Sequence, residues 1–199
     1  MTNPVTAPSN RVKESLKWLL LFGMALAIYL VGAGALRADE GWRLLFHSLT
    51  EALPAQDQQA IYAQMGLAIS ADGRYLLVPD VEAAGPVTIK ASRQDLNGDG
   101  QDEIFLLGGN AYLSGGTGSS IWLFIKSATD QTWRMHLGFP AAAYTVLDER
   151  NAGFPDLRFG GMGWCDGIWR WDGSGYAHHR NVATAPGGCD HLARPRSLR

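Results

Sequence analysis

Hydrophobic and polar positions first set apart the N-terminal part of the chain. An uncharged apolar run covers residues 18–36, and the preceding segment 1–17 carries Arg11, Lys13 and Lys17. A run of this length is about enough to span a bilayer as a helix, and basic residues in front of it favour a cytoplasmic N-terminus. The pattern therefore predicts that segment 1–17 stays in the cytoplasm and that the rest of the chain is exported.

The apolar run 18–36 has three interpretations. We predict an uncleaved membrane anchor, because the run is longer than the apolar core of most signal peptides. A cleaved signal peptide is the main alternative, since Ala33-Gly34-Ala35 provides the small residues typical of a cleavage site. A buried helix of a soluble domain is the third, although such helices usually keep a polar face. The protein is thus expected on the inner membrane, facing the periplasm or the extracellular side, or secreted if the run is cleaved.

Residues 40–66 show a helical period in two pieces. Leu45, Leu49 and Leu53 recur at four-residue spacing, which places them on one helical face. Pro54 separates this piece from the next, and it can open the second helix because its missing N–H is not needed there. We predict a short helical pair that packs on a sheet or spaces it from the membrane.

After the helical pair, the period changes to that of β-strands. Asp72-Gly73 between two short apolar runs is typical of a hairpin turn. The chain also contains 24 glycines and seven tryptophans, which favour Gly-rich turns between aromatic strands. The fold class is therefore predicted to be mainly β, with a β domain over residues 67–181 and a tail over residues 182–199.

The strongest chemical signal is the stretch 95–103, in which oxygen-bearing groups recur at alternate positions. Calcium takes six to eight oxygen ligands, so this spacing predicts a calcium loop. An EF-hand would place a glutamate at position 12, but that position is Leu106, in an apolar run of strand character. We predict a strand-loop-strand site, with Asp102 facing solvent or lying behind the ligands. The predicted ligands, the fourth through its backbone carbonyl, are Asp95, Asn97, Asp99, Gln101 and Glu103. A metal-free hairpin turn is the alternative.

The segment from Asp95 to Ile104 resembles the calcium loop of FG-GAP and integrin-type β-propeller repeats. It is equally similar to a group of exported bacterial proteins with the same Asp-x-Asn-Gly-Asp-Gly loop. In those families the loop joins two strands of a propeller blade and holds calcium, so the resemblance implies the same ligand roles here. It covers only about 15 residues and indicates a metal more than a function. The Gly-Ala-Pro half of the FG-GAP signature is missing, and the repeats are too few for a closed propeller.

A degenerate copy of the loop follows 53 residues later. Asp148 and Asp156 align with its first and last ligands, but Arg150 takes the place of a ligand in between. We predict that this copy binds no calcium and that the Arg150 guanidinium bridges the two aspartates instead. The chain is thus predicted to contain two propeller-blade-like antiparallel repeats, which form a small sandwich or a partial propeller.

The two cysteines, Cys165 and Cys189, are predicted to form a disulfide, as expected of an exported chain with a single pair. This bond would tie the tail to the second repeat. One alternative is a nucleophilic cysteine beside His191. Another is a zinc site that adds His191 and either His178 or His179, for which the ligand spacing is not recognisable.

The remaining signals concern function. Trp164 lies in a predicted loop and is the best candidate for an exposed binding residue, whereas the other aromatic residues are expected in the sheet core or on a glycan-binding surface. A net charge of −2 gives no case for nucleic-acid binding, and no motif of a common enzyme class is present. We predict a non-enzymatic, calcium-stabilised binding or structural module of the cell envelope, with an envelope protein or a glycan as partner. A hydrolase that uses loop carboxylates, such as Asp148 and Asp156, is the alternative.

Overall fold

The computed structural model describes residues 40–49, 51, 53–161 and 163–192. Contacts divide the chain into the units Met1–Glu40 and Gly41–Arg199. The predicted cytoplasmic segment and the apolar run 18–36 lie outside the described residues. Among the helices of the described part, none is long and apolar enough to cross a membrane.

Two short helices precede the main sheets. α2 spans Gly41–Leu45 and α3 spans Ala55–Met65. α3 begins directly after Pro54, where a residue without an N–H is tolerated, and ends at Gly66, whose φ of 62° is the left-handed conformation that glycine adopts most easily. A helical pair interrupted at the proline is therefore present.

The helix predicted from the spacing of Leu45, Leu49 and Leu53 is only partly present. α2 ends at Leu45, and a turn in which the N–H of Leu49 donates to the Phe46 carbonyl follows it. Leu49 and Leu53 therefore do not extend this helix. Both still pack against the buried cluster beneath the helices, so their four-residue spacing reflects burial and not a continuous helix.

A small hairpin leads from the helices to the main sheets. β1 (Ala68–Ile69) pairs with β2 (Leu76–Leu77), as the turn at Asp72-Gly73 predicts. The Ser70 hydroxyl donates to the Asp72 carboxylate at 2.6 Å and closes this turn. A 3₁₀ turn, η1 (Glu82–Ala84), follows.

Two four-stranded antiparallel sheets form the body of the described chain, and each joins consecutive strands in order. The first sheet consists of β3 (Thr88–Gln94), β4 (Glu103–Gly109), β5 (Ser120–Lys126) and β6 (Trp133–Pro140). The second sheet consists of β7 (Ala143–Asn151), β8 (Phe154–Gly160), β9 (Cys165–Trp171) and β10 (Tyr176–Ala183). The predicted fold class, mainly β with antiparallel sheets, is confirmed, and the described strands form no closed barrel.

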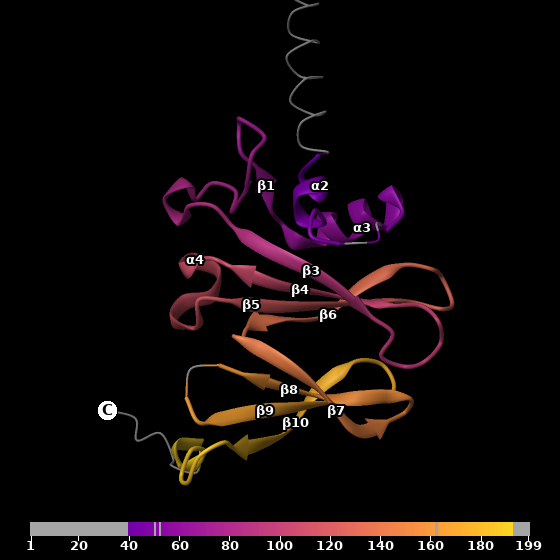
Figure 1. The fold of residues 1–199 in the computed structure, drawn as a ribbon, viewed down its shortest axis with the longest axis vertical. Coiled ribbons are helices and arrows are strands. Elements are labelled where there is room, and N and C mark those ends of the chain that lie inside the picture. Colours follow the sequence, from indigo (N-terminus) through magenta and orange to yellow (C-terminus); the bar gives the residue numbers. More distant parts are fainter. Residues whose placement is uncertain (1–39, 50, 52, 162, 193–199) are drawn as a thin grey trace, which may run out of the picture. The chain divides into compact units, whose positions relative to one another are not determined.

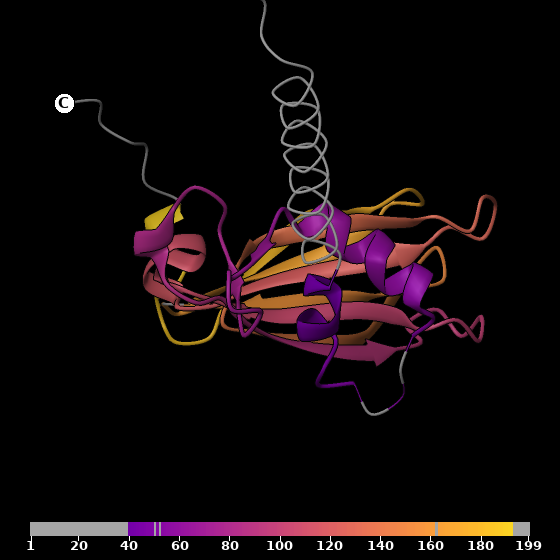
Figure 2. The ribbon, with the colours of Figure 1, turned by 90° about the horizontal axis from the view of Figure 1, so that it is seen from above.

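The first sheet is covered on both faces (Figures 1 and 2). Ile104 and Leu106 of β4 belong to the cluster shared with the helices, whereas Phe105 belongs to the cluster between the two sheets. Alternate residues of one strand therefore enter two different cores. This is why β4 reads as a continuous apolar run and not as an alternating one.

The segment between β4 and β5 contains more structure than its glycines predict. α4 (Ala111–Ser114) and the 3₁₀ turn η2 (Gly115–Thr117) occupy it. The side chain of Asn110 accepts a hydrogen bond from the Leu113 N–H at 3.0 Å and caps α4. Near the C-terminal end of the described residues, η3 (Asp190–Leu192) adds a further short turn.

Candidate functional site

The predicted calcium loop connects β3 to β4, and strand pairing stops at Gln94 and Glu103 on either side of it. The loop is wound around Asp95, whose carboxylate accepts hydrogen bonds from the N–H of Gly98 at 2.7 Å and of Gly100 at 3.0 Å. Both glycines have positive φ angles, of 81° and 84°, which side-chain-bearing residues rarely adopt. These N–H groups, that of Gly100 above all, lower the pKa of Asp95 and keep it ionised.

The next predicted ligands continue the same turn. The Asn97 amide donates to the Asp99 carboxylate at 2.9 Å, and the other oxygen of that carboxylate accepts from the Gln101 N–H at 2.7 Å. The Gln101 side chain donates to the Lys126 carbonyl at 3.4 Å, which attaches the loop to the end of β5. The loop therefore presents the side-chain oxygens of three successive alternate positions.

Glu103 closes the loop from inside the protein. Its side chain is only 2% exposed, and one oxygen accepts the Leu96 N–H at 2.7 Å. Burial raises the pKa of Glu103 to about 7, and the negative charges of Asp99 and Asp95 add to this rise, whereas the Leu96 N–H opposes it. A carboxylate in this position needs either a proton or a cation.

The donor set fits calcium in its chemistry, because all five predicted ligands offer oxygen. Among the described residues, no three His, Cys, Asp or Glu side chains lie close enough together to hold an ion as they stand. A calcium ion would have to replace the hydrogen bond from the Asn97 amide to Asp99, since that bond turns a nitrogen toward the carboxylate. The two side chains concerned are half-buried (Asn97) and exposed (Asp99).

Asp102 lies on the outer side of the loop, where its carboxylate pairs with Arg93 of β3 at 2.6 Å. The pair is about one-third exposed on each side. Asp102 therefore holds the base of the loop to the preceding strand, away from the predicted ligands.

The degenerate copy forms the β7–β8 hairpin. Ala152 and Gly153 make its turn with φ angles of 46° and 90°, so the hairpin closes in two residues and leaves no room for a ligand loop. The predicted bridge from Arg150 to Asp148 and Asp156 is wrong. Asp156 instead accepts hydrogen bonds from Arg170 of β9 through both oxygens.

Arg150 has a role that the sequence does not reveal. Its guanidinium donates to the Leu96 carbonyl at 2.9 Å and to the Gly153 carbonyl at 2.8 Å. The backbone of Leu96 is therefore held on one side by Glu103 and on the other by a residue of the second sheet. The Leu96 side chain is 1% exposed in the core between the sheets. The loop is thus attached to both sheets, and no sequence signal could show a contact between residues so far apart.

The predicted disulfide is present, because Cys165 and Cys189 are bonded and the described residues contain no free cysteine. The nucleophile and zinc alternatives need thiol groups that this bond removes. Next to it, Trp164 is 67% exposed, and its carbonyl accepts the Thr184 N–H at 2.8 Å. The loop of Trp164 is therefore fixed at its base while the indole faces solvent.

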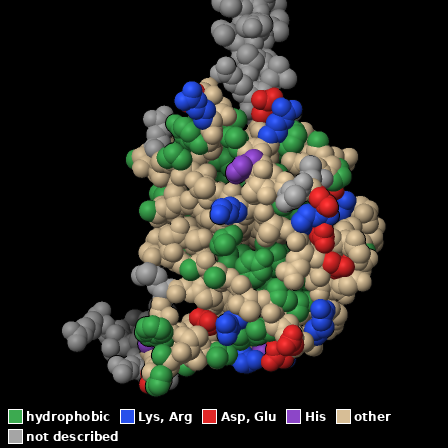
Figure 3. Space-filling model, viewed as in Figure 1, with side chains coloured by type: hydrophobic (Ala, Val, Ile, Leu, Met, Phe, Trp, Pro, Cys, Tyr) green, Lys and Arg blue, Asp and Glu red, His purple; other side chains and the backbone are tan. Residues whose placement is uncertain are grey.

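The other tryptophans of the β domain are less exposed. Trp133 and Trp171 are buried, and Trp122 and Trp169 are half-buried. Figure 3 shows acidic and basic side chains side by side on the face viewed.

Comparison of the chain with protein-family models, with curated proteins and with solved structures found no match.

Proposed function

We propose that this chain is a calcium-stabilised β domain of the cell envelope that serves as a binding or structural module. The proposal rests on a buried carboxyl group that has no basic partner among the described residues. Glu103 and Asp156 occupy matching positions of the two repeats, 53 residues apart, and both are buried. Asp156 is neutralised by Arg170, which donates to it at 2.7 Å.

Glu103 lacks such a partner. In the described part of the chain, no Lys, Arg or His forms an ion pair with it, and the charged groups that act on it are Asp99 and Asp95. Burying an unpaired charge is costly, so native structures pair such groups or coordinate a metal with them. A calcium ion held by the loop would supply the positive charge that Arg170 supplies in the second repeat.

The two sheets are best described as propeller-blade-like repeats stacked head to tail. Ile104 and Leu106 of the first sheet face the helices, and the matching Leu157 and Phe159 of the second sheet face the first sheet. Each repeat therefore packs the equivalent face on the layer that precedes it in the chain, whereas a symmetric sandwich would bury equivalent faces of the two sheets against each other. The outer face of the second sheet carries ion pairs, such as Arg158 with Asp166, as suits a terminal repeat.

Export is supported by the disulfide, since such bonds persist in oxidising compartments. The run 18–36 would anchor the domain in the inner membrane if it is uncleaved. Trp164, which is 67% exposed, is the aromatic residue through which an envelope protein or a glycan would bind. Asp156, one half of the acid pair of the hydrolase alternative, is fully buried and bound to Arg170.

Calcium titration of the purified full-length chain by calorimetry tests the proposal. We expect one site with a Kd of about 10⁻⁴–10⁻³ M, the range of extracellular modules. Asp99→Asn should weaken binding at least tenfold. Asp72→Asn, which removes a carboxylate from the β1–β2 turn, is the matched control and should bind as the wild type does. Absence of calcium binding to the wild type would overturn the proposal.

A further inference from the structure

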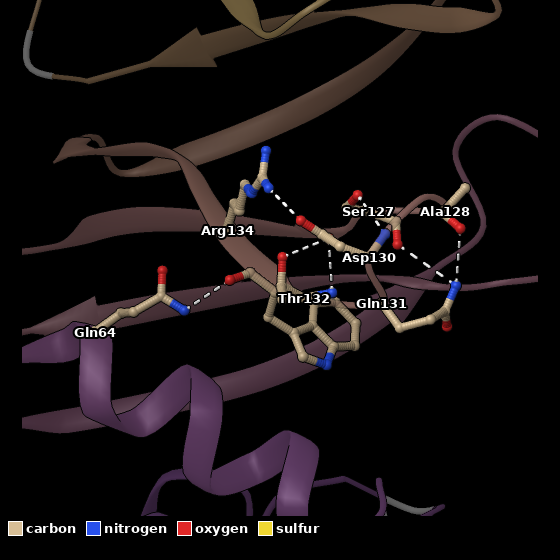
Figure 4. A network of polar contacts seen from close by, with 8 residues as sticks. Gln64, Ser127, Ala128, Asp130, Gln131, Thr132 and Arg134 are labelled. Atoms are coloured by element: carbon tan, nitrogen blue, oxygen red, sulfur yellow. Dashed lines mark hydrogen bonds and ion pairs between the residues drawn. The ribbon is translucent and has the colours of Figure 1, made fainter.

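The two edge strands of the first sheet, β3 and β6, are each capped by a single side chain. At β3, the Ser48 hydroxyl accepts the Ala91 N–H at 2.9 Å and donates to the Ala91 carbonyl at 3.3 Å. At β6, the Gln64 side chain donates to the Trp133 carbonyl at 2.9 Å and accepts the Met135 N–H at 3.2 Å. Figure 4 shows Gln64 reaching from α3 to this edge. Both side chains therefore occupy hydrogen-bonding groups that an added strand would need.

The edge strand β10 of the second sheet has no such cap. β9 is its only strand partner in the described domain, and no other described residue hydrogen-bonds the main chain of residues 177–183. Residues 177–181 and 183 are also exposed. Because only alternate N–H and C=O groups of an edge strand point toward its neighbour, the remaining groups of β10 are open to a further strand.

The opposite edge strand, β7, is less regular than β10. Leu147, Asp148 and Glu149 lie opposite a single residue of β8, Asp156, so the paired part of β7 is split by a bulge of several residues. β10 has one extra residue, His179, and its last four residues pair regularly with β9. Since a bulge disrupts the ladder locally, β10 is the better edge for adding a strand.

Both ends of β10 are fixed to the rest of the second sheet. Tyr176, at its start, is 6% exposed, and its hydroxyl is hydrogen-bonded to β8 at 2.8 Å. Just after its end, the Thr184 N–H donates to the Trp164 carbonyl, and the Cys165–Cys189 disulfide joins the following segment to β9. An edge that is already ordered costs little conformational entropy when a partner pairs with it.

The side chains of β10 determine which kind of strand fits. The strand contains His178, His179 and Arg180 and no acidic residue. Arg180 forms no ion pair within the described residues, and the one acidic residue of β9, Asp166, is paired with Arg158 at 3.6 Å. An unpaired charge at an edge discourages indiscriminate strand pairing, whereas a carboxylate on the neighbouring strand is favoured.

Strand register shows where that carboxylate would lie. Arg180 is opposite Ile168 of β9, which is opposite Arg158 of β8, so the three side chains form one row on one face of the sheet. Ile168 is only 1% exposed between the two arginines. A strand added to β10 would place its own side chain at the end of this row, beside Arg180.

We infer that β10 is the docking edge for an extended acidic segment of a partner protein, which adds to the second sheet as a further strand. Main-chain hydrogen bonds to β10 supply the affinity, and a carboxylate beside Arg180 supplies the selectivity. The segment also reaches Trp164, because Trp164 is hydrogen-bonded to Thr184 at the end of β10. This inference goes beyond the proposed function and needs no calcium.

Fluorescence anisotropy of a labelled, capped peptide of alternating valine and glutamate residues, titrated with the full-length chain, tests the inference. The wild type should bind the peptide. Arg180→Glu should weaken binding about tenfold, because a like-charge pair replaces an opposite-charge pair. Lys90→Glu is the matched control and should bind as the wild type does. Lys90 is also an exposed basic residue of an edge strand, but Ser48 caps that edge. Circular dichroism checks that every variant is folded.

Two further arms separate strand pairing from charge attraction. The same peptide with methylated main-chain nitrogens keeps its glutamates but has no main-chain donors, so it should not bind. The unmodified peptide should slow hydrogen exchange of the amides of residues 177–183 and leave that of β7 unchanged.

Equal binding of the peptide by Arg180→Glu, or of the methylated peptide by the wild type, would overturn the inference. Protection of β7 instead of β10 would overturn it as well. Self-association of the wild type that Arg180→Glu abolishes would assign the edge to a second copy and would also contradict it. A wild type that binds calcium but not the peptide would overturn this inference and leave the calcium proposal intact.

Discussion

Asp156 is fully buried, and Arg170 binds both of its carboxylate oxygens. At the position of the second repeat that matches Glu103, the buried charge is therefore paired, and this pair should be essential for stability. Removing one partner of a buried pair leaves an uncompensated charge, which is more harmful than loss of an exposed pair.

Arg170→Gln should therefore lower the thermal midpoint by about 5–10 °C. Arg74→Gln, which breaks an exposed pair, should change it by no more than about 2 °C. Scanning calorimetry of both variants measures this. The double variant Asp156→Asn with Arg170→Gln should recover part of the lost thermal stability. An equal decrease of the thermal midpoint in Arg170→Gln and Arg74→Gln would contradict the role of Arg170.

His136 gives the protein a defined response to acid. Burial, and then the charge of Arg134, lower its pKa. Asp99, Lys126 and Arg134 are the charged residues that line, together with His136, a pocket of about 250 Å³. The folded chain thus binds fewer protons at this residue than the unfolded chain does. The stability contributed by neutral His136 is present above its unfolded pKa, about 6.5, and is lost as the pH falls below that value.

His136→Gln should accordingly lose less stability than the wild type between pH 7.5 and pH 5.5. The measurement is the unfolding free energy of both proteins at several pH values in the presence of calcium. Because both proteins share all other titrating groups, the difference isolates His136. A difference that stays constant with pH would show that the imidazole is protonated equally in the folded and unfolded chains.

At the scale of elements, Leu96 joins the loop to both sheets. Its N–H donates to Glu103 and its carbonyl accepts from Arg150, while its side chain packs between the sheets. Leu123 is equally buried in the same cluster but lies in the middle of β5. The two leucines therefore separate loss of core packing from loss of loop support.

Leu96→Ala and Leu123→Ala should each cost about 2–5 kcal/mol of unfolding free energy, as buried leucine truncations do. Only Leu96→Ala should also weaken calcium binding, by about tenfold, because the collapsing cavity shifts the backbone that Glu103 and Arg150 hold. Denaturant unfolding and calcium titration measure the two effects. Equal calcium affinity of the two variants would contradict the prediction that packing of Leu96 supports the loop.

The elements predictable from the sequence are those with local signals. Strands follow from the alternation of neighbouring side chains, and the β1–β2 hairpin follows from the Asp72-Gly73 turn. The disulfide follows because the chain has only one pair of cysteines. The continuation of α2 toward Leu53 was predicted wrongly, because burial without a helix gives the same four-residue spacing. α4 was missed, since its cap at Asn110 precedes only four helical residues.

The site was predictable only as far as the loop itself. The alternation of oxygen-bearing side chains indicates candidate ligands, but not that Glu103 would be buried. Arg170 of β9 binds Asp156 in place of the predicted Arg150, and Arg150 of β7 instead donates to the Leu96 carbonyl in the first loop. Such long-range choices depend on strand register.

At the scale of the whole molecule, calcium bound to the loop should stabilise the packing of the two sheets against each other. The ion would neutralise Glu103, and Glu103 holds Leu96, whose side chain lies in the shared core. Occupancy of the loop should therefore raise the stability of the entire described domain and not only that of the loop.

The thermal midpoint of the full-length chain in 10 mM calcium, compared with the midpoint in a chelator, tests this most directly. With a Kd of about 10⁻⁴–10⁻³ M, calcium should add about 2 kcal/mol and raise the midpoint by roughly 4–8 °C. Glu103→Gln should remain folded without calcium and show no shift, because the amide removes the buried charge. An unchanged midpoint of the wild type, or an equal shift in Glu103→Gln, would contradict the proposal that calcium stabilises the domain by neutralising Glu103.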